Sequence, residues 1–172
     1  MTRWTACWPS SRATSTEALT PRAGCVTLPR VSTFRLPRQR DALSGFADAF
    51  AAWCTQAGVP AAVATRFQIA FDELLTNAIT HGAPEAADEP LVVNLRADAQ
   101  RLEAEIIDAG PPFNPLAQAA PDTTLTLDER DPGGLGLLLV RELIDEVQWR
   151  HAEGRNHLRL AHPFSDAPAT TG

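Results

Sequence analysis

The 172-residue sequence has the length of one domain of ordinary size, and its 44% hydrophobic and 21% charged residues are typical of globular proteins. A net charge of −6 argues against a protein that binds nucleic acid through phosphate neutralisation. No apolar run approaches the ~18 residues that would cross a membrane. The three cysteines form no close pair, so we expect a cytoplasmic protein without a disulfide framework or a zinc site.

The chain divides into three predicted parts. Residues 1–26 are rich in Ser, Thr, Pro and Arg and have no hydrophobic period, which predicts a disordered or ill-defined extension. We predict that the folded domain covers residues 27–163 and that residues 164–172 form a flexible tail. The domain opens with a predicted strand over residues 26–36 and a helix over residues 41–57.

Four arginines cluster around the predicted strand and the start of the helix that follows it. We expect all four to be solvated, because charged side chains at the ends of elements usually face water. The four are Arg30, Arg35, Arg38 and Arg40.

Residues 66–82 predict the central helix, since apolar residues recur there at three- and four-residue steps. Pro60 suits its first turn and Gly82 its end. Glu73 and Asn77 lie one turn apart at the edge of the apolar stripe. A half-buried carboxylate and carboxamide need partners, and a metal with its phosphates would supply them. A solvated helix edge is the commoner meaning of such a pair taken alone.

Alternating residues over 91–95 and 102–107 predict an antiparallel hairpin. Asp108 and Gly110 follow its second strand, where the carboxylate needs a donor and the glycine permits a close approach. The exocyclic amine of an adenine would meet both conditions, and an ordinary Asp–Gly turn is the alternative. Residues 114–132 are polar and without period, which predicts a mobile loop.

A glycine-rich stretch, Gly133–Gly136, leads into an apolar helix predicted over residues 137–144. Glycines let several backbone N–H groups converge, and the positive end of the helix dipole adds to an anion cradle. A plain loop before a helix is the alternative. The stretch is not a Walker A motif, because no Gly-Lys-Ser/Thr follows it. Residues 147–151 and 156–160 predict a second hairpin.

The order of these motifs resembles the N, G1 and G2 boxes of the Bergerat-fold (GHKL) ATPases, and most closely the small anti-sigma-factor serine/threonine kinases. The matching stretches are Glu73–His81, Asp108–Phe113, Gly133–Leu137, Arg141–Glu146 and Gly154–Leu160. The resemblance covers roughly residues 30–162. It implies an α+β two-layer sandwich, in which a mixed, mostly antiparallel sheet is covered on one face by about three helices.

The resemblance also implies a role for each matched residue. Asn77 would ligate the Mg²⁺ that bridges the phosphates of ATP, and Glu73 would orient or deprotonate a substrate serine. Asp108 would accept a hydrogen bond from the adenine amine, with Gly110 beside the ring. Asn156 would hold a water that helps to read adenine. The residues that meet the phosphates would be Gly133, Gly134, Leu135, Gly136 and Leu137.

By the same resemblance, the chain would be an ATP-dependent anti-sigma regulatory factor. It would phosphorylate an anti-anti-sigma protein of the STAS type on serine or threonine, bind a sigma factor in a partner switch, and form a homodimer. Two alternatives stay open at this point. The first is a nucleotide-dependent binding module that sequesters a regulatory partner without catalysis. The second is the detached ATPase module of a histidine kinase.

Overall fold

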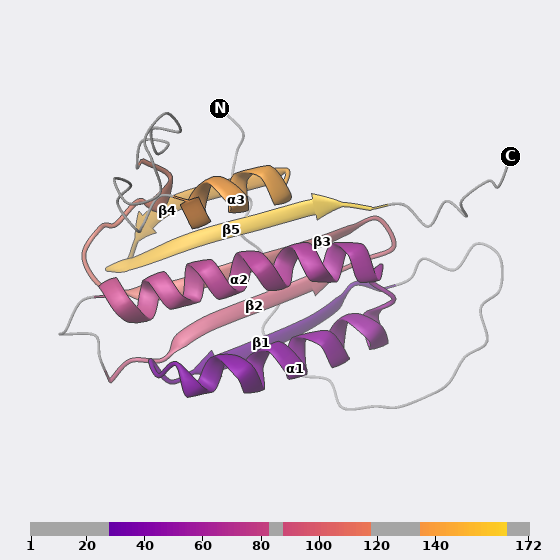
Figure 1. Cartoon of the computed structure of the whole chain (residues 1–172), viewed down its shortest axis with the longest axis horizontal. Helices are drawn as coiled ribbons and strands as arrows, with labels where there is room; N and C mark the ends of the chain where they lie inside the picture. Colours follow the sequence, from indigo (N-terminus) through magenta and orange to yellow (C-terminus); the bar gives the residue numbers. More distant parts are fainter. Residues whose placement is uncertain (1–27, 83–87, 118–134, 165–172) are drawn as a thin grey trace, which may run out of the picture.

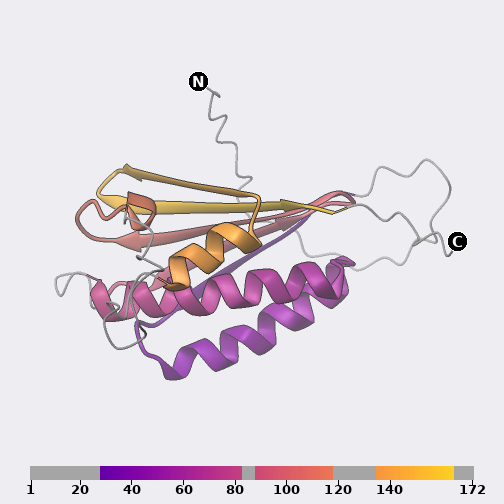
Figure 2. The ribbon, with the colours of Figure 1, turned by 45° about the horizontal axis from the view of Figure 1, so that its top comes forward.

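The computed structural model describes residues 28–82, 88–117 and 135–164, and these form two layers (Figures 1 and 2). Five strands form one sheet in the order β1-β2-β3-β5-β4, with every described pairing antiparallel. The strands are β1 (Arg30–Leu36), β2 (Leu91–Ala97), β3 (Arg101–Ala109), β4 (Glu146–Ala152) and β5 (Arg155–Pro163). The helices α1 (Asp41–Ala57), α2 (Ala61–His81) and α3 (Leu135–Leu143) cover one face. The predicted two-layer sandwich is confirmed.

Most elements follow the sequence pattern closely. The helix predicted over residues 41–57 has those bounds in the structure, and α2 begins directly after Pro60 and ends directly before Gly82. The first strand begins at Arg30, four residues later than predicted. The predicted extension, residues 1–26, lies outside the described residues, as does the tail from residue 165 onward.

Packing of aromatic rings fixes α1 against α2. The ring of Phe50 meets that of Phe71 edge-on, with centroids 5.1 Å apart, and Phe46 meets Phe71 at 5.3 Å. Edge-to-face geometry at these distances adds to the gain from burial, because the positive ring edge faces the negative ring face. Phe50 and Phe67 are fully buried. Figure 2 shows α2 lying between α1 and α3 on the covered face of the sheet, so α2 is the central helix of its layer.

Among the described residues, the opposite face of the sheet carries charged side chains instead of a second helical layer. Glu103 lies at its centre and accepts hydrogen bonds from Arg159 at 2.6 Å and from Arg96 at 3.1 Å, while Arg101 forms an ion pair with it at 3.2 Å. Burial alone would raise the pKa of Glu103, but these arginines hold it below its ordinary value. Glu103 is only 9% exposed, so the arginines enclose it closely on this face.

None of the helices in the described part of the chain is long and apolar enough to cross a membrane. The longest of them, α2, exposes a mixture of polar and apolar residues that includes Thr65, Ile69 and Asp72.

Candidate functional site

The C-terminal half of α2 carries the first pair of candidate residues. Glu73 and Asn77 are both half-buried, while Leu74 and Leu75 between them are buried in the core. The predicted position at the edge of the apolar stripe is therefore confirmed. Within the described residues, the side-chain hydrogen bonds of α2 come from Thr65, Arg66 and Thr80, and not from this pair. In the described part of the chain the polar groups of Glu73 and Asn77 therefore have no hydrogen-bond partner, and they can bind a ligand.

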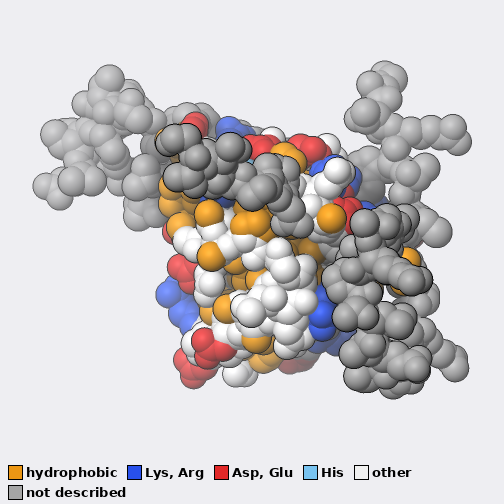
Figure 3. Space-filling model, turned by 90° about the vertical axis from the view of Figure 1, so that its right-hand side faces the viewer, with side chains coloured by type: hydrophobic (Ala, Val, Ile, Leu, Met, Phe, Trp, Pro, Cys, Tyr) orange, Lys and Arg blue, Asp and Glu red, His pale blue; other side chains and the backbone are white. Residues whose placement is uncertain are grey.

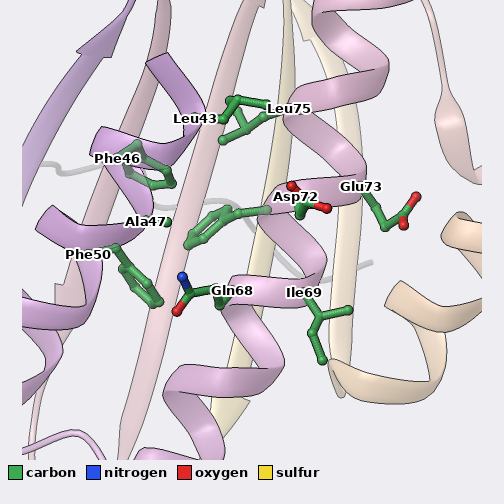
Figure 4. Close-up of a pocket in the computed structure, with 10 residues that line it drawn as sticks. Leu43, Phe46, Ala47, Phe50, Gln68, Ile69, Asp72, Glu73 and Leu75 are labelled. Carbon is green, nitrogen blue, oxygen red and sulfur yellow. The ribbon is translucent and has the colours of Figure 1, made fainter. Parts of the chain in front are cut away.

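The start of α3 lies against Glu73. A β-carbon built at Gly136 would overlap the carboxylate of Glu73, so any side chain larger than hydrogen would displace it. Figure 4 shows the Glu73 side chain pointing away from the α1 aromatic rings and toward the neighbouring helix. The structure therefore brings the predicted base and one glycine of the predicted phosphate turn into direct contact.

A separate hollow of about 350 Å³ lies between α1 and α2 (Figure 4). Its wall is mainly apolar and includes Phe46, Phe50 and Ile69, with Glu73 at its margin. Asn77, Asp108 and Gly110 do not line it. We therefore do not assign this hollow to the nucleotide, since its polar lining residues, Gln68, Asp72 and Glu73, include no cation that would bind phosphates.

Asp108 lies within β3 and not beyond it, because the strand continues through Ala109. Its carboxylate forms an ion pair with Arg38, whose side chain is 6% exposed while that of Asp108 is 19% exposed. The interpretation of the four arginines as solvated is therefore wrong for Arg38. Sequence reasoning missed this residue, although the need of Asp108 for a donor was a signal that could have found it.

Gly110 adopts a backbone conformation that disfavours other residues, with φ at +146°. Its carbonyl oxygen lies 3.2 Å from Nε2 of His151 on β4. The turn after β3 is thus bound to the last hairpin, and it presents the backbone at Gly110 without a side chain. This agrees with the predicted close approach of a ligand, and the approach itself stays a prediction.

Asn156 fixes the same turn from β5. Its Oδ1 accepts hydrogen bonds from the backbone N–H of Phe113 at 2.9 Å and from Nε1 of Trp149 at 3.3 Å. Its Nδ2 donates to the carbonyl of Pro111 at 2.9 Å. Asn156 is 7% exposed, and both ends of its carboxamide are hydrogen-bonded. The side chain therefore positions the segment after Gly110. Its predicted water-binding role stays a prediction.

The glycine-rich turn is only partly described. Gly133 and Gly134 lie outside the described residues, Leu135 is the first residue of α3, and Leu137 is buried in the core at 6% exposure. Only the backbone of Leu137 could therefore face a ligand. Most of the predicted loop over residues 114–132 also lies outside the described part.

The beginning of that loop is described and is held to α3. Pro115–Ala117 form one 3-10 turn, and the guanidinium of Arg141 donates to the carbonyl of Leu116. The start of the loop is thus fixed beside the same helix that carries Gly136.

Taken together, the predicted residues meet around the C-terminal half of α2. Gly136 contacts Glu73, and Arg38 joins Asp108 to the carbonyl of Ala78, which follows Asn77 in the chain. The opposite end of the molecule is different, because Figure 3 shows hydrophobic and uncharged side chains in the middle of that face and charged ones around its margin.

The protein groups at this site could hold magnesium only together with the phosphates of a bound nucleotide. No group of three or more His, Cys, Asp or Glu side chains that could bind a metal occurs among the described residues. Mg²⁺ prefers hard oxygen ligands, keeps several waters, and is commonly held by one or two protein groups together with substrate phosphates. The carboxamide oxygen of Asn77 fits that second arrangement.

Three comparisons place the chain among known proteins. The family model described as "Histidine kinase-like ATPase domain" matches residues 36–162, which is most of the chain. The chain is 29% identical over 89 residues to the serine/threonine-protein kinase BtrW of Bordetella bronchiseptica, covering 52% of this chain and 63% of that protein. It is 32% identical over 91 residues to the serine-protein kinase RsbW of Bacillus subtilis, covering 51% and 57%. The chain thus matches less than two thirds of either relative.

The fold has a counterpart among solved structures. The crystal structure of the RsbU and RsbW domains of a Mycobacterium tuberculosis protein superposes with a TM-score of 0.57, at 18% identity, over 77% of this chain and 32% of that one. This likeness concerns the fold, and it agrees with the match to the family model. The chain therefore belongs to the family of histidine kinase-like ATPase domains.

Proposed function

We propose that this chain is an ATP-dependent protein serine/threonine kinase of the anti-sigma type. The observation that carries the proposal is the contact between Gly136 and Glu73, one helical turn from Asn77. In this arrangement the start of α3 meets the Glu73 carboxylate, and the Asn77 carboxamide lies one helical turn further along α2. Phosphoryl transfer needs such positioning and charge neutralisation more than it needs covalent chemistry from the protein.

Each residue of the cluster has a separate task in this proposal. Asn77 would hold the magnesium ion, which would neutralise charge on the phosphates. The N–H groups at the start of α3, beside Gly136, would bind phosphate oxygens together with the helix dipole. Glu73 would orient the attacking hydroxyl and accept its proton. Asp108 would accept a hydrogen bond from the adenine amine, and Gly110 would lie beside the ring.

The proposed substrate is a serine or threonine of an anti-anti-sigma protein of the STAS type, and the proposed second partner is a sigma factor. The names of the two relatives, a serine/threonine-protein kinase and a serine-protein kinase, support transfer to a hydroxyl. A partner switch between the two proteins, with the kinase as a homodimer in the cytoplasm, completes the proposal.

Transfer of labelled phosphate from ATP·Mg²⁺ to candidate STAS-type proteins tests the kinase activity. We expect Glu73→Gln to abolish transfer while ATP still binds, because the carboxamide has a similar size but cannot accept the proton. Asp72→Asn is the matched control, since Asp72 is the adjacent acidic residue and is exposed; it should leave transfer unchanged. Asn77→Ala should remove the magnesium dependence of ATP binding, as measured by calorimetry.

The same assays separate the alternatives. Normal ATP·Mg²⁺ binding without transfer to any candidate protein would replace the kinase with a nucleotide-dependent binding module. A transferred phosphate that is labile to acid and stable to alkali would indicate histidine as the acceptor, and so an ATPase module that serves a histidine kinase.

A further inference from the structure

The guanidinium of Arg38 is buried at the meeting point of three segments. Its Nε donates to the carbonyl of Glu89 at 2.9 Å, its Nη1 to the carbonyl of Ala78 at 3.2 Å, and its Nη2 to the carbonyl of Ala109 at 3.2 Å. Nη2 also forms the ion pair with Oδ1 of Asp108. A buried charge is costly unless it is paired and hydrogen-bonded, and here four oxygen atoms meet that need.

The backbone encloses the guanidinium on the α2 side. A β-carbon built at Gly82 would lie 2.7 Å from Nη1 of Arg38 and would also overlap the carbonyl of Ala78. The chain leaves α2 directly over the guanidinium, and the absence of a side chain at Gly82 makes room for it. Arg38 therefore has little freedom to move, because three main-chain carbonyls and the end of α2 hold its planar head.

The fixed guanidinium of Arg38 sets the orientation of the Asp108 carboxylate. Arg38 contacts Oδ1, while Oδ2 accepts no hydrogen bond from the described residues, and the Asp108 side chain is 19% exposed. An ionised carboxylate only accepts hydrogen bonds. Asp108 is thus held with one oxygen toward Arg38, and its other oxygen has no donor within the described part of the chain.

We propose that Arg38 is the positioning residue that sets the base specificity of this site, by orienting the free oxygen of Asp108 toward the exocyclic amine of adenine. The inference rests on the proposed function and adds a residue to it. A base with a carbonyl oxygen in place of that amine would meet the carboxylate oxygen with like partial charge and with no donor at that position. A site built to hydrogen-bond a donor rejects analogues that lack it, because its own polar group is left unpaired.

The test compares ATP with inosine triphosphate, which carries an oxygen in place of the amine. Calorimetry with Mg²⁺ present would give both affinities for the wild-type chain, Arg38→Met, Arg38→Lys and Arg40→Met. Arg40 is the matched control because it also donates to α2, at 3.1 Å to Oγ1 of Thr80, but is exposed. Unfolding in urea would show that each variant is folded.

We expect the wild-type chain to favour ATP, and Arg38→Met to lower the ratio of ATP to inosine triphosphate affinity about 10- to 100-fold, the range of one charged hydrogen bond. Arg38→Lys should keep part of the preference, since its ammonium can still reach one acceptor, and it serves as the main variant if Arg38→Met does not fold. Arg40→Met should leave the ratio unchanged.

Three results would overturn the inference. One is an unchanged ratio in folded Arg38→Met and Arg38→Lys chains. Another is an equal loss of affinity for both nucleotides, which would give Arg38 a structural role alone. The third is tighter ATP binding in Arg38→Met, which would make the guanidinium a competitor of the base. A wild-type chain that binds neither nucleotide would instead overturn the proposed function, and this inference with it.

Discussion

Replacing Gly136 with alanine adds one methyl group at the point where the start of α3 contacts Glu73. The new β-carbon would overlap the carboxylate of Glu73 and would lie 3.2 Å from its Cγ. Because the end of a glutamate side chain is flexible, the carboxylate can rotate away, at a cost of about 0.5–1.5 kcal/mol for leaving its preferred rotamer. Alanine gains up to about 1 kcal/mol over glycine inside a helix, and the gain is smaller at position 136 because it lies in the first turn of α3. The free energy of unfolding should therefore stay within about 1 kcal/mol of the wild type.

Phosphoryl transfer should respond far more strongly than stability. A displacement of about 1 Å at a reacting group can cost about 100-fold in rate, so we expect Gly136→Ala to slow single-turnover transfer by about that factor. Gly45→Ala is the matched control, since Gly45 is exposed in α1 and a β-carbon there would meet nothing within 4 Å. It should stabilise the fold by up to about 1 kcal/mol and leave transfer unchanged.

Two results with the Gly136→Ala chain would refute this prediction. Full transfer activity in Gly136→Ala would show that the position of the Glu73 carboxylate does not matter for the reaction. A loss of more than about 3 kcal/mol in unfolding free energy would show that the carboxylate cannot move aside, as overpacked sites behave. In a Glu73→Ala background, which removes the overlap, Gly136→Ala should instead stabilise the chain.

Other predictions concern the fold. Phe50→Ala should lower the unfolding free energy by about 3–5 kcal/mol in urea titrations, because Phe50 is 0% exposed, and a loss under about 1 kcal/mol would contradict its place in the core. Burial raises the pKa of the Cys54 thiol from 9.0 to about 12. In a variant whose other two cysteines are serine, Cys54 should resist alkylation at pH 8 until urea unfolds the chain, and rapid labelling of the native protein would refute this. The contribution of the neutral, buried Cys54 thiol to the unfolding free energy should be complete below pH 9, and it should disappear as the pH rises toward 12. Glu103→Gln should cost about 1–3 kcal/mol at pH 7, through weaker hydrogen bonds to its arginines. Because the fold lowers the pKa of Glu103, the difference from wild type should shrink as the pH falls below the ordinary value of 4.5, and a constant difference would count against the charged network.

Local pattern in the sequence determined the elements and the order of the motifs. Apolar steps of three and four residues gave α1 its bounds, and Pro60 and Gly82 gave α2 its ends. Alternation of residue types gave the two hairpins. These features are local, because a helix or strand buries one face at a fixed period along its own residues. The half-buried position of Glu73 followed from the same period.

Only the tertiary structure decided which side chains meet. Arg38 pairs with Asp108 across 70 positions of sequence, and the overlap between Gly136 and Glu73 joins α3 to α2. No local period encodes such a contact, because it depends on how the helices lie on the sheet and on where β1 and β3 end. From the sequence, Arg38 looks like an ordinary solvated arginine. In the structure it is buried, because the ends of α2 and β3 and the segment before β2 supply the four oxygen atoms that compensate its charge.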